Sequence, residues 1–342
     1  MIFRSVVSLP AVADMRSPYL GEIHRGYTQS WNFTIERRLP MDMVASVAYV
    51  GTESTHMLAD RDINSGFPLS GNTGRPYASK FGRTIATNMW DGYLSAHYHS
   101  LQTSLNKQLS KGLLIKGAYT YSRAINMTDD DGWASVGYNW GPVFYRNRAA
   151  AGYDRTHVLQ MGWVYELPVG KGKTFANSGP ASYILGNWQV NGVISAYTGT
   201  PFSVTAPGAA LNAPSNSQNA DQLKSDVVRL GGVGPGTNYY DPTAFAAPTT
   251  PGRFGSTGRD ILRSPGTFNT DLSVFREFLF RERMRLSFRA EFFNLPNTSH
   301  FGSTGENGGS GMASTDVTNP NFLRITSSYG ERQIRFGLRL SF

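Results

Sequence analysis

The sequence contains no cysteine and few charged residues. Its 342 residues include 32 Lys and Arg and 24 Asp and Glu, so only 16% are charged and the net charge is +8. Soluble domains carry about 25% charged residues. The absence of cysteine excludes a disulfide scaffold and cysteine-ligated zinc or iron–sulfur sites. Aromatic residues make up 13% of the chain, which argues against a disordered protein because disordered chains are poor in aromatics.

The sequence also lacks a long hydrophobic run. No stretch approaches the roughly 18 consecutive apolar residues of a membrane-spanning helix, and the mean hydropathy is −0.32. A helical membrane protein is therefore excluded, whereas a membrane β-barrel is not, because its strands alternate apolar and polar residues. At the N-terminus, Arg4 interrupts an apolar segment that Pro10 ends, so we do not expect a signal peptide.

Strict alternation of apolar and polar residues over residues 332–342 indicates a β-strand with one apolar and one polar face. Its apolar face consists of Ile334, Phe336, Leu338, Leu340 and Phe342. The same period of two recurs upstream in the segments 29–38, 43–51, 93–109, 113–123, 156–167, 185–198, 267–278 and 284–293. These patterns predict nine strands, and residues 2–9 could supply a tenth.

The connections between these segments alternate between short and long. The short ones are 39–42, 110–112, 168–184 and 279–283. The long ones, rich in Gly, Pro, Asn and Ser, are 52–92, 124–155, 199–266 and 294–331. Membrane barrels have this arrangement, with short turns on the periplasmic side and long extracellular loops.

We therefore predict an all-β fold, an antiparallel up-and-down transmembrane β-barrel in the outer membrane of a Gram-negative bacterium. The main alternative is a soluble β-sandwich, which also alternates apolar and polar residues. Sandwich strands average five or six residues, whereas several segments here reach about ten, the length that a tilted strand needs to cross a bilayer. Aromatic residues near the predicted strand ends fit the girdles at the headgroup level. They are Trp31, Tyr49, Trp163, Tyr165 and Trp188.

Several segments resemble the C-terminal barrel half of TonB-dependent outer-membrane receptors, particularly the Oar-like type with a carboxypeptidase-regulatory-like N-terminal domain. These segments are 29–39, 48–52, 119–122, 154–157, 186–192 and 289–294. The strand that ends at Phe342 is similar to the terminal strand that the barrel-assembly machinery recognises in outer-membrane proteins. The resemblance covers the chain from about residue 18 to residue 342.

The resemblance implies a receptor that takes up a scarce solute with energy that TonB delivers through a plug domain. Barrels of this family have 22 strands, so nine or ten strands suggest the C-terminal part of a larger barrel. The family's signal peptide, TonB box and plug have no counterpart in this sequence, and we do not expect the chain to transport actively by itself. Two alternatives remain: a self-contained ten-strand barrel that acts as a passive pore or adhesin, and a soluble carbohydrate-binding module.

Charged residues recur on the polar faces of the last two predicted strands. They are Arg285, Arg289, Glu291, Arg335 and Arg339. In a barrel they would face the lumen, where they could attract anionic solutes or brace neighbouring strands through ion pairs; bracing is the favoured interpretation. The sequence pI of about 9.6 could also suggest nucleic-acid binding, but no basic run or motif supports such a partner.

The loop 124–155 concentrates aromatic and acidic residues. Candidate contacts to an unknown extracellular solute are Asp129, Asp131, Trp133, Tyr138, Trp140 and Tyr145. The same residues could instead form a packed loop without a ligand, and that interpretation is favoured. His97 and His99 share a strand face, but no third ligand follows at a useful spacing, so we predict no metal site. We find no catalytic constellation or cofactor motif, and therefore expect no enzymatic activity.

Overall fold

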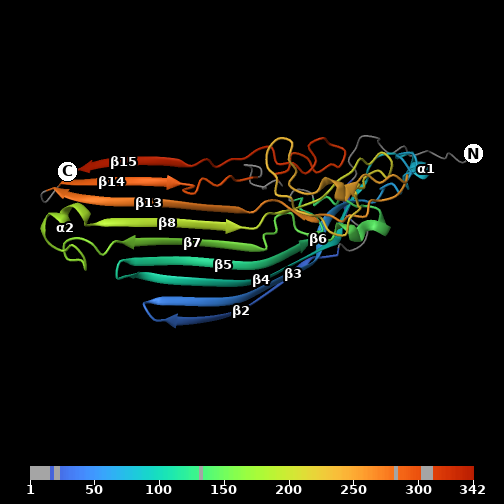
Figure 1. Cartoon of the computed structure of the whole chain (residues 1–342). Coiled ribbons are helices and arrows are strands. Elements are labelled where there is room, and N and C mark those ends of the chain that lie inside the picture. Colours follow the sequence, from blue (N-terminus) through green and yellow to red (C-terminus); the bar gives the residue numbers. More distant parts are fainter. Residues whose placement is uncertain (1–15, 19–23, 131–133, 281–283, 302–310) are drawn as a thin grey trace, which may run out of the picture.

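The computed structural model describes residues 16–18, 24–130, 134–280, 284–301 and 311–342. Within these residues, nine long strands form one antiparallel sheet in which each strand pairs with its neighbours along the chain (Figure 1). They are β2 (Tyr27–Leu39), β3 (Met43–Asp62), β4 (Asn88–Ser110), β5 (Leu113–Asn126), β7 (His157–Glu166), β8 (Trp188–Tyr197), β13 (Thr267–Phe280), β14 (Met284–Phe293) and β15 (Gln333–Ser341). The all-β, up-and-down prediction is confirmed, and each of the nine predicted segments contains a strand.

Two short strands pair with the ends of interior strands of this sheet. β1 (Arg16–Pro18) pairs with β4 in parallel, and β6 (Ala149–Ala150) pairs with β5. The tenth strand predicted at residues 2–9 lies outside the described residues. No helix in the described part of the chain is long and apolar enough to cross a membrane.

The register of the sheet collects the apolar residues on one face. Phe336 of β15 pairs with Ala290, Ala290 with Val274, and Val274 with Val190, and side chains of directly paired residues lie on the same face. Leu113 and other apolar residues continue this face across β7 and β5. Large side chains on it are exposed, with Phe336 at 71%. So broad an apolar surface fits a hydrocarbon environment and not water.

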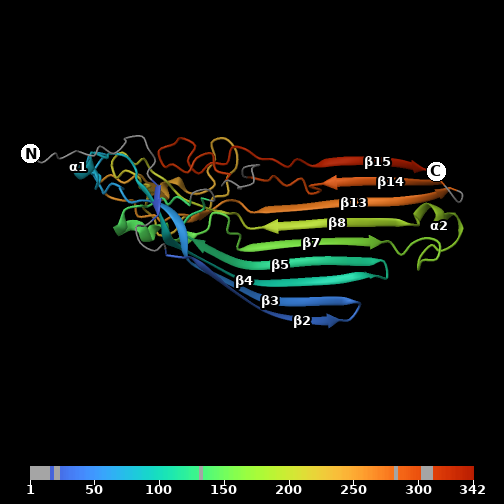
Figure 2. The ribbon, with the colours of Figure 1, turned by 180° about the vertical axis from the view of Figure 1, so that it is seen from behind.

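The two ends of the sheet differ in the length of their connections. At the end that we call the turn end, β2 and β3 are joined by residues 40–42, β4 and β5 by Lys111 and Gly112, and β7 and β8 by a segment that contains α2 (Gly179–Leu185). Lys111 and Gly112 both have positive φ angles, as a two-residue hairpin turn requires. The long connections lie together at the opposite, loop end (Figures 1 and 2).

Two strands are longer than the alternation predicted. β3 has 20 residues and β4 has 23, whereas the predicted strands ended at residue 51 and began at residue 93. The register shifts between Ser54 and Leu58, where His56 has a positive φ of 54°, and this bulge breaks the alternation beyond it. About ten residues suffice to cross a bilayer, so the hairpin extends well beyond the membrane at the loop end.

The long loops form a folded unit that we call the loop cap, the described parts of 63–87, 127–156, 198–266 and 294–332. Short elements within it are α1 (Ala78–Phe81), η1 (Gly141–Asn147), β9 (Pro201–Phe202), β10 (Asp221–Gln222), η2 (Pro242–Ala244), β11 (Phe245–Ala246) and β12 (Leu262–Arg263). The larger cluster of buried apolar residues in the described chain lies here and includes Val204, Phe245, Leu323 and Ile325. The loops that seemed featureless in sequence therefore contain the hydrophobic core.

The sheet is open in the part of the chain that the structure describes. β2 forms one edge, β15 forms the other, and the two do not pair. The described strands thus make an open sheet (Figure 2), as expected for the partial barrel that the sequence predicts.

Candidate functional site

The five charged residues predicted on the last two strands lie on the polar face of the sheet. In the backbone register of β14 and β15, Glu291 lies opposite Arg335, and Ser287 lies opposite Arg339. Arg285 and Arg289 occupy the same face of β14 because they alternate with the apolar residues of that strand.

These charges form no ion pairs with one another or with other described residues. Arg335 donates from Nη2 to Oε1 of Gln333 at 3.1 Å and lies 5.0 Å from the centre of the Phe293 ring. Arg289 lies 5.3 Å from the centre of the Phe275 ring. Both guanidinium groups lie over aromatic rings, and the donors of Arg289 and the remaining donors of Arg335 are available to a solute.

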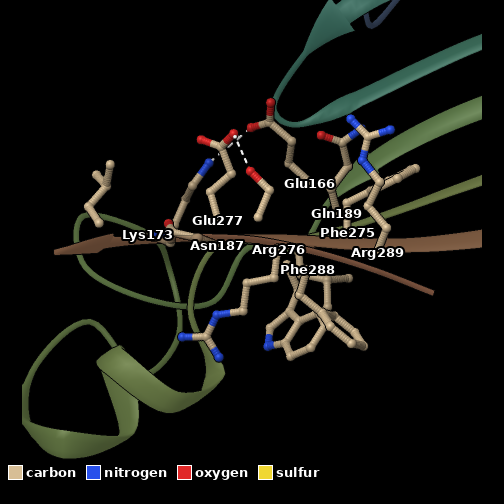
Figure 3. Close-up of a pocket in the computed structure, with 13 residues that line it drawn as sticks. Glu166, Lys173, Asn187, Gln189, Phe275, Arg276, Glu277, Phe288 and Arg289 are labelled. Carbon is tan, nitrogen blue, oxygen red and sulfur yellow. Dashed lines mark hydrogen bonds and ion pairs between the residues drawn. The ribbon is translucent and has the colours of Figure 1, made fainter. Parts of the chain in front are cut away.

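A hollow of about 650 Å³ lies at the turn end beside Arg289. On the polar side of β13, Lys173 pairs with Glu166 at 3.2 Å, and the Ser287 hydroxyl donates to Glu277 at 3.4 Å. Figure 3 shows that Arg276 and Phe288 line the hollow from the other side of the strand. The residues that line the hollow therefore lie on both faces of the sheet, and the hollow is not confined to the polar face.

Arg276 is a buried charge on the apolar face that the sequence did not reveal. Its guanidinium donates to the backbone carbonyls of Tyr183 and Ile184 in α2, and it lies 5.2 Å from the centre of the Trp188 ring. The last carbonyls of a helix lack partners within the helix, so the arginine and the helix end satisfy one another. Trp188 is thereby held at the turn end of the apolar face.

The aromatic residues of the loop 124–155 form a packed cluster in the loop cap. Tyr138 is buried, and burial raises the pKa of its hydroxyl. Trp140 stacks on Phe254 with ring centres 6.3 Å apart, and Arg146 lies 5.6 Å from the Phe254 ring. Tyr145 is 69% exposed, so Tyr145 and the partly exposed Trp140 are accessible to a solute, whereas Tyr138 is not.

Asp129 is fully engaged with neighbouring protein groups. Its Oδ1 accepts from Asn126 Nδ2 and from the Gly152 backbone N–H, each at 2.8 Å, and its Oδ2 accepts from Arg259 Nη1 at 3.1 Å. Asp131 and Trp133 lie outside the described residues. Within the described ranges, no three His, Cys, Asp or Glu side chains are grouped so that they could hold a metal ion.

Asn216 joins three of the loops in the cap, a role that no sequence pattern indicated. Its Oδ1 accepts from the backbone N–H groups of Asn139 and Trp140 at 3.0 and 2.9 Å, and its Nδ2 donates to the Gly66 carbonyl at 2.9 Å. A buried ion pair between Arg75 and Asp62, at 2.8 Å, lies in the same region.

A family model described as "Outer membrane beta barrel domain" matches residues 10–335. The chain belongs to this family. In an outer-membrane barrel the apolar face contacts lipid, the polar face lines the lumen and the long loops are extracellular, so the loop cap lies outside the cell and the turn end faces the periplasm.

Three solved structures resemble the chain in fold. The outer membrane transporter YddB from Escherichia coli is 8% identical, with a TM-score of 0.46 over 96% of this chain and 34% of that chain. FpvA from Pseudomonas aeruginosa, solved with bound pyoverdines, is 11% identical, with a TM-score of 0.45 over 94% of this chain and 28% of that chain. BauA, the ferric preacinetobactin receptor from Acinetobacter baumannii, is 10% identical, with a TM-score of 0.44 over 93% of this chain and 29% of that chain.

This outer-membrane barrel domain spans about a third or less of the length of these structures. No protein with curated annotation matches the chain.

Proposed function

We propose that the chain forms part of the barrel wall of a TonB-dependent outer-membrane receptor that takes up a scarce solute. The open sheet is the observation that carries this proposal. In the described part of the chain, β2 and β15 both present unpaired backbone groups along an edge, and each unpaired group in hydrocarbon costs several kcal/mol. In the proposed receptor, further strands pair with both edges. The sequence segments that resemble the C-terminal barrel half of such receptors indicate which kind of barrel those strands complete.

The chemistry of the lumen suggests the kind of solute. Arg285, Arg289, Arg335 and Arg339 line one part of the lumen face without carboxylate partners, and arginine binds carboxylate and phosphate groups through paired N–H donors. Trp140 and Tyr145 provide accessible aromatic surface outside. We infer an anionic solute with some apolar or planar surface.

The proposal implies three kinds of partner and no enzymatic role. Outer-membrane lipid covers the apolar face. The barrel-assembly machinery recognises β15, at whose end Phe342 is 96% exposed. TonB acts on a plug domain and not on the strands described here.

Uptake measurements in the native host test the proposal. Disruption of the gene within this segment should abolish accumulation of one labelled solute during starvation, and a protonophore should abolish it equally in the wild type. The variant Arg289→Gln/Arg339→Gln should lower uptake about tenfold or more, because each lost charge-assisted hydrogen bond is worth about a tenfold change in affinity. The variant Arg37→Gln/Arg38→Gln, which removes two charges from β2, is the matched control.

Other outcomes would contradict the proposal in distinguishable ways. Uptake that is insensitive to the protonophore, together with single-channel conductance of the purified chain in a planar bilayer, would identify a passive pore. Partition of the protein into buffer instead of detergent would indicate a soluble binding module. An upstream reading frame that stops directly before the Met1 codon would leave β2 and β15 without further strands from the same polypeptide.

A further inference from the structure

A group of basic side chains lies on the lipid-facing surface at its extracellular boundary. We call it the basic rim; its members are His97, His99, Arg123, Arg148 and His157. Arg123 pairs directly with His99, and the rings of His97 and His99 lie 5.8 Å apart. Arg148 contributes its Nη2, 3.2 Å from Nδ1 of His97. The cluster thus joins β4, β5 and the loop before β7.

The position of the basic rim along the strands places it in the headgroup layer. Arg123 lies about ten residues beyond the start of β5 at Leu113, and His157 lies at the opposite end of β7 from the turn. A strand crosses the hydrocarbon in about 9–11 residues. The strands therefore leave the hydrocarbon at the level of the basic rim.

Tyrosine hydroxyls mark the same boundary. The hydroxyl of Tyr49 lies 2.9 Å from Nδ1 of His99, and that of Tyr119 lies 2.8 Å from Nδ1 of His157. Tyrosine rings in membrane barrels occupy the interface, with the ring toward hydrocarbon and the hydroxyl toward the headgroups. The histidines lie on the headgroup side of these rings.

Among the described residues, the basic rim has one carboxylate directly opposite it. Arg123 and Arg148 are exposed, as are His99 and His157. The one carboxylate that pairs across strands with this group is Glu53, opposite His97. The two guanidinium groups thus outnumber the one carboxylate, and they lie with the imidazoles at the layer where lipid headgroups lie. Guanidinium groups bind phosphate oxygens through paired N–H donors.

We propose that the basic rim binds the phosphate groups of a phosphorylated glycolipid in the outer leaflet. The lipid-facing orientation and the interfacial level of the cluster favour a lipid phosphate over a soluble one. Arg123 and Arg148 hold the phosphate oxygens, and the imidazoles add donors beside them. This binding site is separate from the solute pathway and does not depend on the proposed uptake function.

Vesicle binding by the full chain tests the proposal. The variant Arg123→Gln/Arg148→Gln should bind vesicles that contain bisphosphorylated lipid A about tenfold or more weakly than the wild type. The wild type should show a similar loss on vesicles whose lipid A has been dephosphorylated. The matched control Arg37→Gln/Arg38→Gln removes two arginines at the periplasmic end of β2 and should leave binding unchanged within about twofold.

Two further measurements separate the remaining explanations. Inorganic phosphate in solution should not displace the vesicles; complete displacement would make the basic rim a site for free phosphate and overturn the lipid assignment. Phosphorus that co-purifies with the protein from native membranes should fall in the Arg123→Gln/Arg148→Gln variant and not in the control. Equal phosphorus in both variants, or equal vesicle binding with and without lipid phosphate, would refute the proposal.

Discussion

Replacing Asn216 with alanine tests whether one side chain holds the loop cap together. Alanine removes the acceptor of the Asn139 and Trp140 N–H groups and the donor to the Gly66 carbonyl. Each intramolecular hydrogen bond contributes about 1 kcal/mol net. The side chain also donates to the nearby Ala213 and Pro214 carbonyls, but only the three other bonds join different loops. Their loss should therefore favour local opening of the three loops by about 3 kcal/mol. Asn216 is only half-buried, so water can hydrogen-bond to some of the backbone groups that lose their partner. The larger free-energy cost of leaving a fully buried polar group unpaired therefore does not apply.

Amide hydrogen exchange measures this opening directly. A change of about 3 kcal/mol corresponds to roughly 100-fold faster exchange at the amides of Asn139 and Trp140, since 1.4 kcal/mol is a factor of ten. Amides in the middle of β13 should keep their protection because the sheet is not altered. The neighbouring variant Ser217→Ala is the control: Ser217 is exposed, and its hydroxyl forms no hydrogen bond within the described chain. Acceleration below tenfold in Asn216→Ala, or equal acceleration in both variants, would refute the reasoning.

Three other predictions concern the lipid face and the extracellular loops. Phe336→Arg should destabilise the folded protein by about 2–4 kcal/mol if the side chain lies at the middle of the membrane, measurable by denaturant titration in lipid. Gly192→Ala should destabilise by about 1–3 kcal/mol and shift tryptophan fluorescence, because a Cβ at this position would lie within the Trp163 ring. The pKa of Asp241 is lowered from 3.8 to about 2, chiefly by the hydrogen bond from Lys224. Its contribution to loop stability should be complete above pH 4 and lost as the pH falls toward 2, and NMR titration of the carboxyl group should show this.

Each of these predictions has its own control and contrary result. A nearly neutral Phe336→Arg would argue against a lipid-facing position. Gly162→Ala adds a methyl group on the lumen side, where the nearest atom is 3.7 Å away, and should be well tolerated; equal losses at the two glycines would contradict the steric explanation. Lys224→Met should return the pKa of Asp241 toward 3.8, and a wild-type value near 4 would contradict the assigned cause.

The membrane part of the fold could be predicted because one physical rule governs it. Lipid on one side and water on the other impose a period of two on every strand. The face on which the apolar residues of β14 and β15 lie can therefore be predicted from each strand alone. The paired positions of Phe336, Ala290 and Val274 agree with this rule. The predicted lumen-facing arginines could be placed on one face for the same reason, although their lack of ion pairs could not, because that depends on which side chains lie opposite.

The loop cap could not be predicted because its contacts follow no period. Leu323 and Phe245 are buried in one cluster although they are distant in sequence, and neither belongs to a strand long enough to show a period. Asn216 bonds to residues 76 or more positions away, and an isolated asparagine in a Ser- and Asn-rich segment has the composition of an ordinary turn. The position of Arg276 could not be predicted for a related reason. Its partners are backbone carbonyls of α2, and backbone carbonyls are present in every sequence.

The sheet and the loop cap are stabilised by different interactions. The strands are stabilised by the hydrogen-bond ladder and by lipid, so many sequences with the right alternation can serve as wall. The loop cap must bury its own apolar residues in water, and its shape therefore depends on particular residues such as Leu323 and Asn216. Specificity for an extracellular solute requires a fixed surface. If the proposed uptake of a solute is right, the cap supplies such a surface outside the membrane, in addition to the arginines of the lumen face.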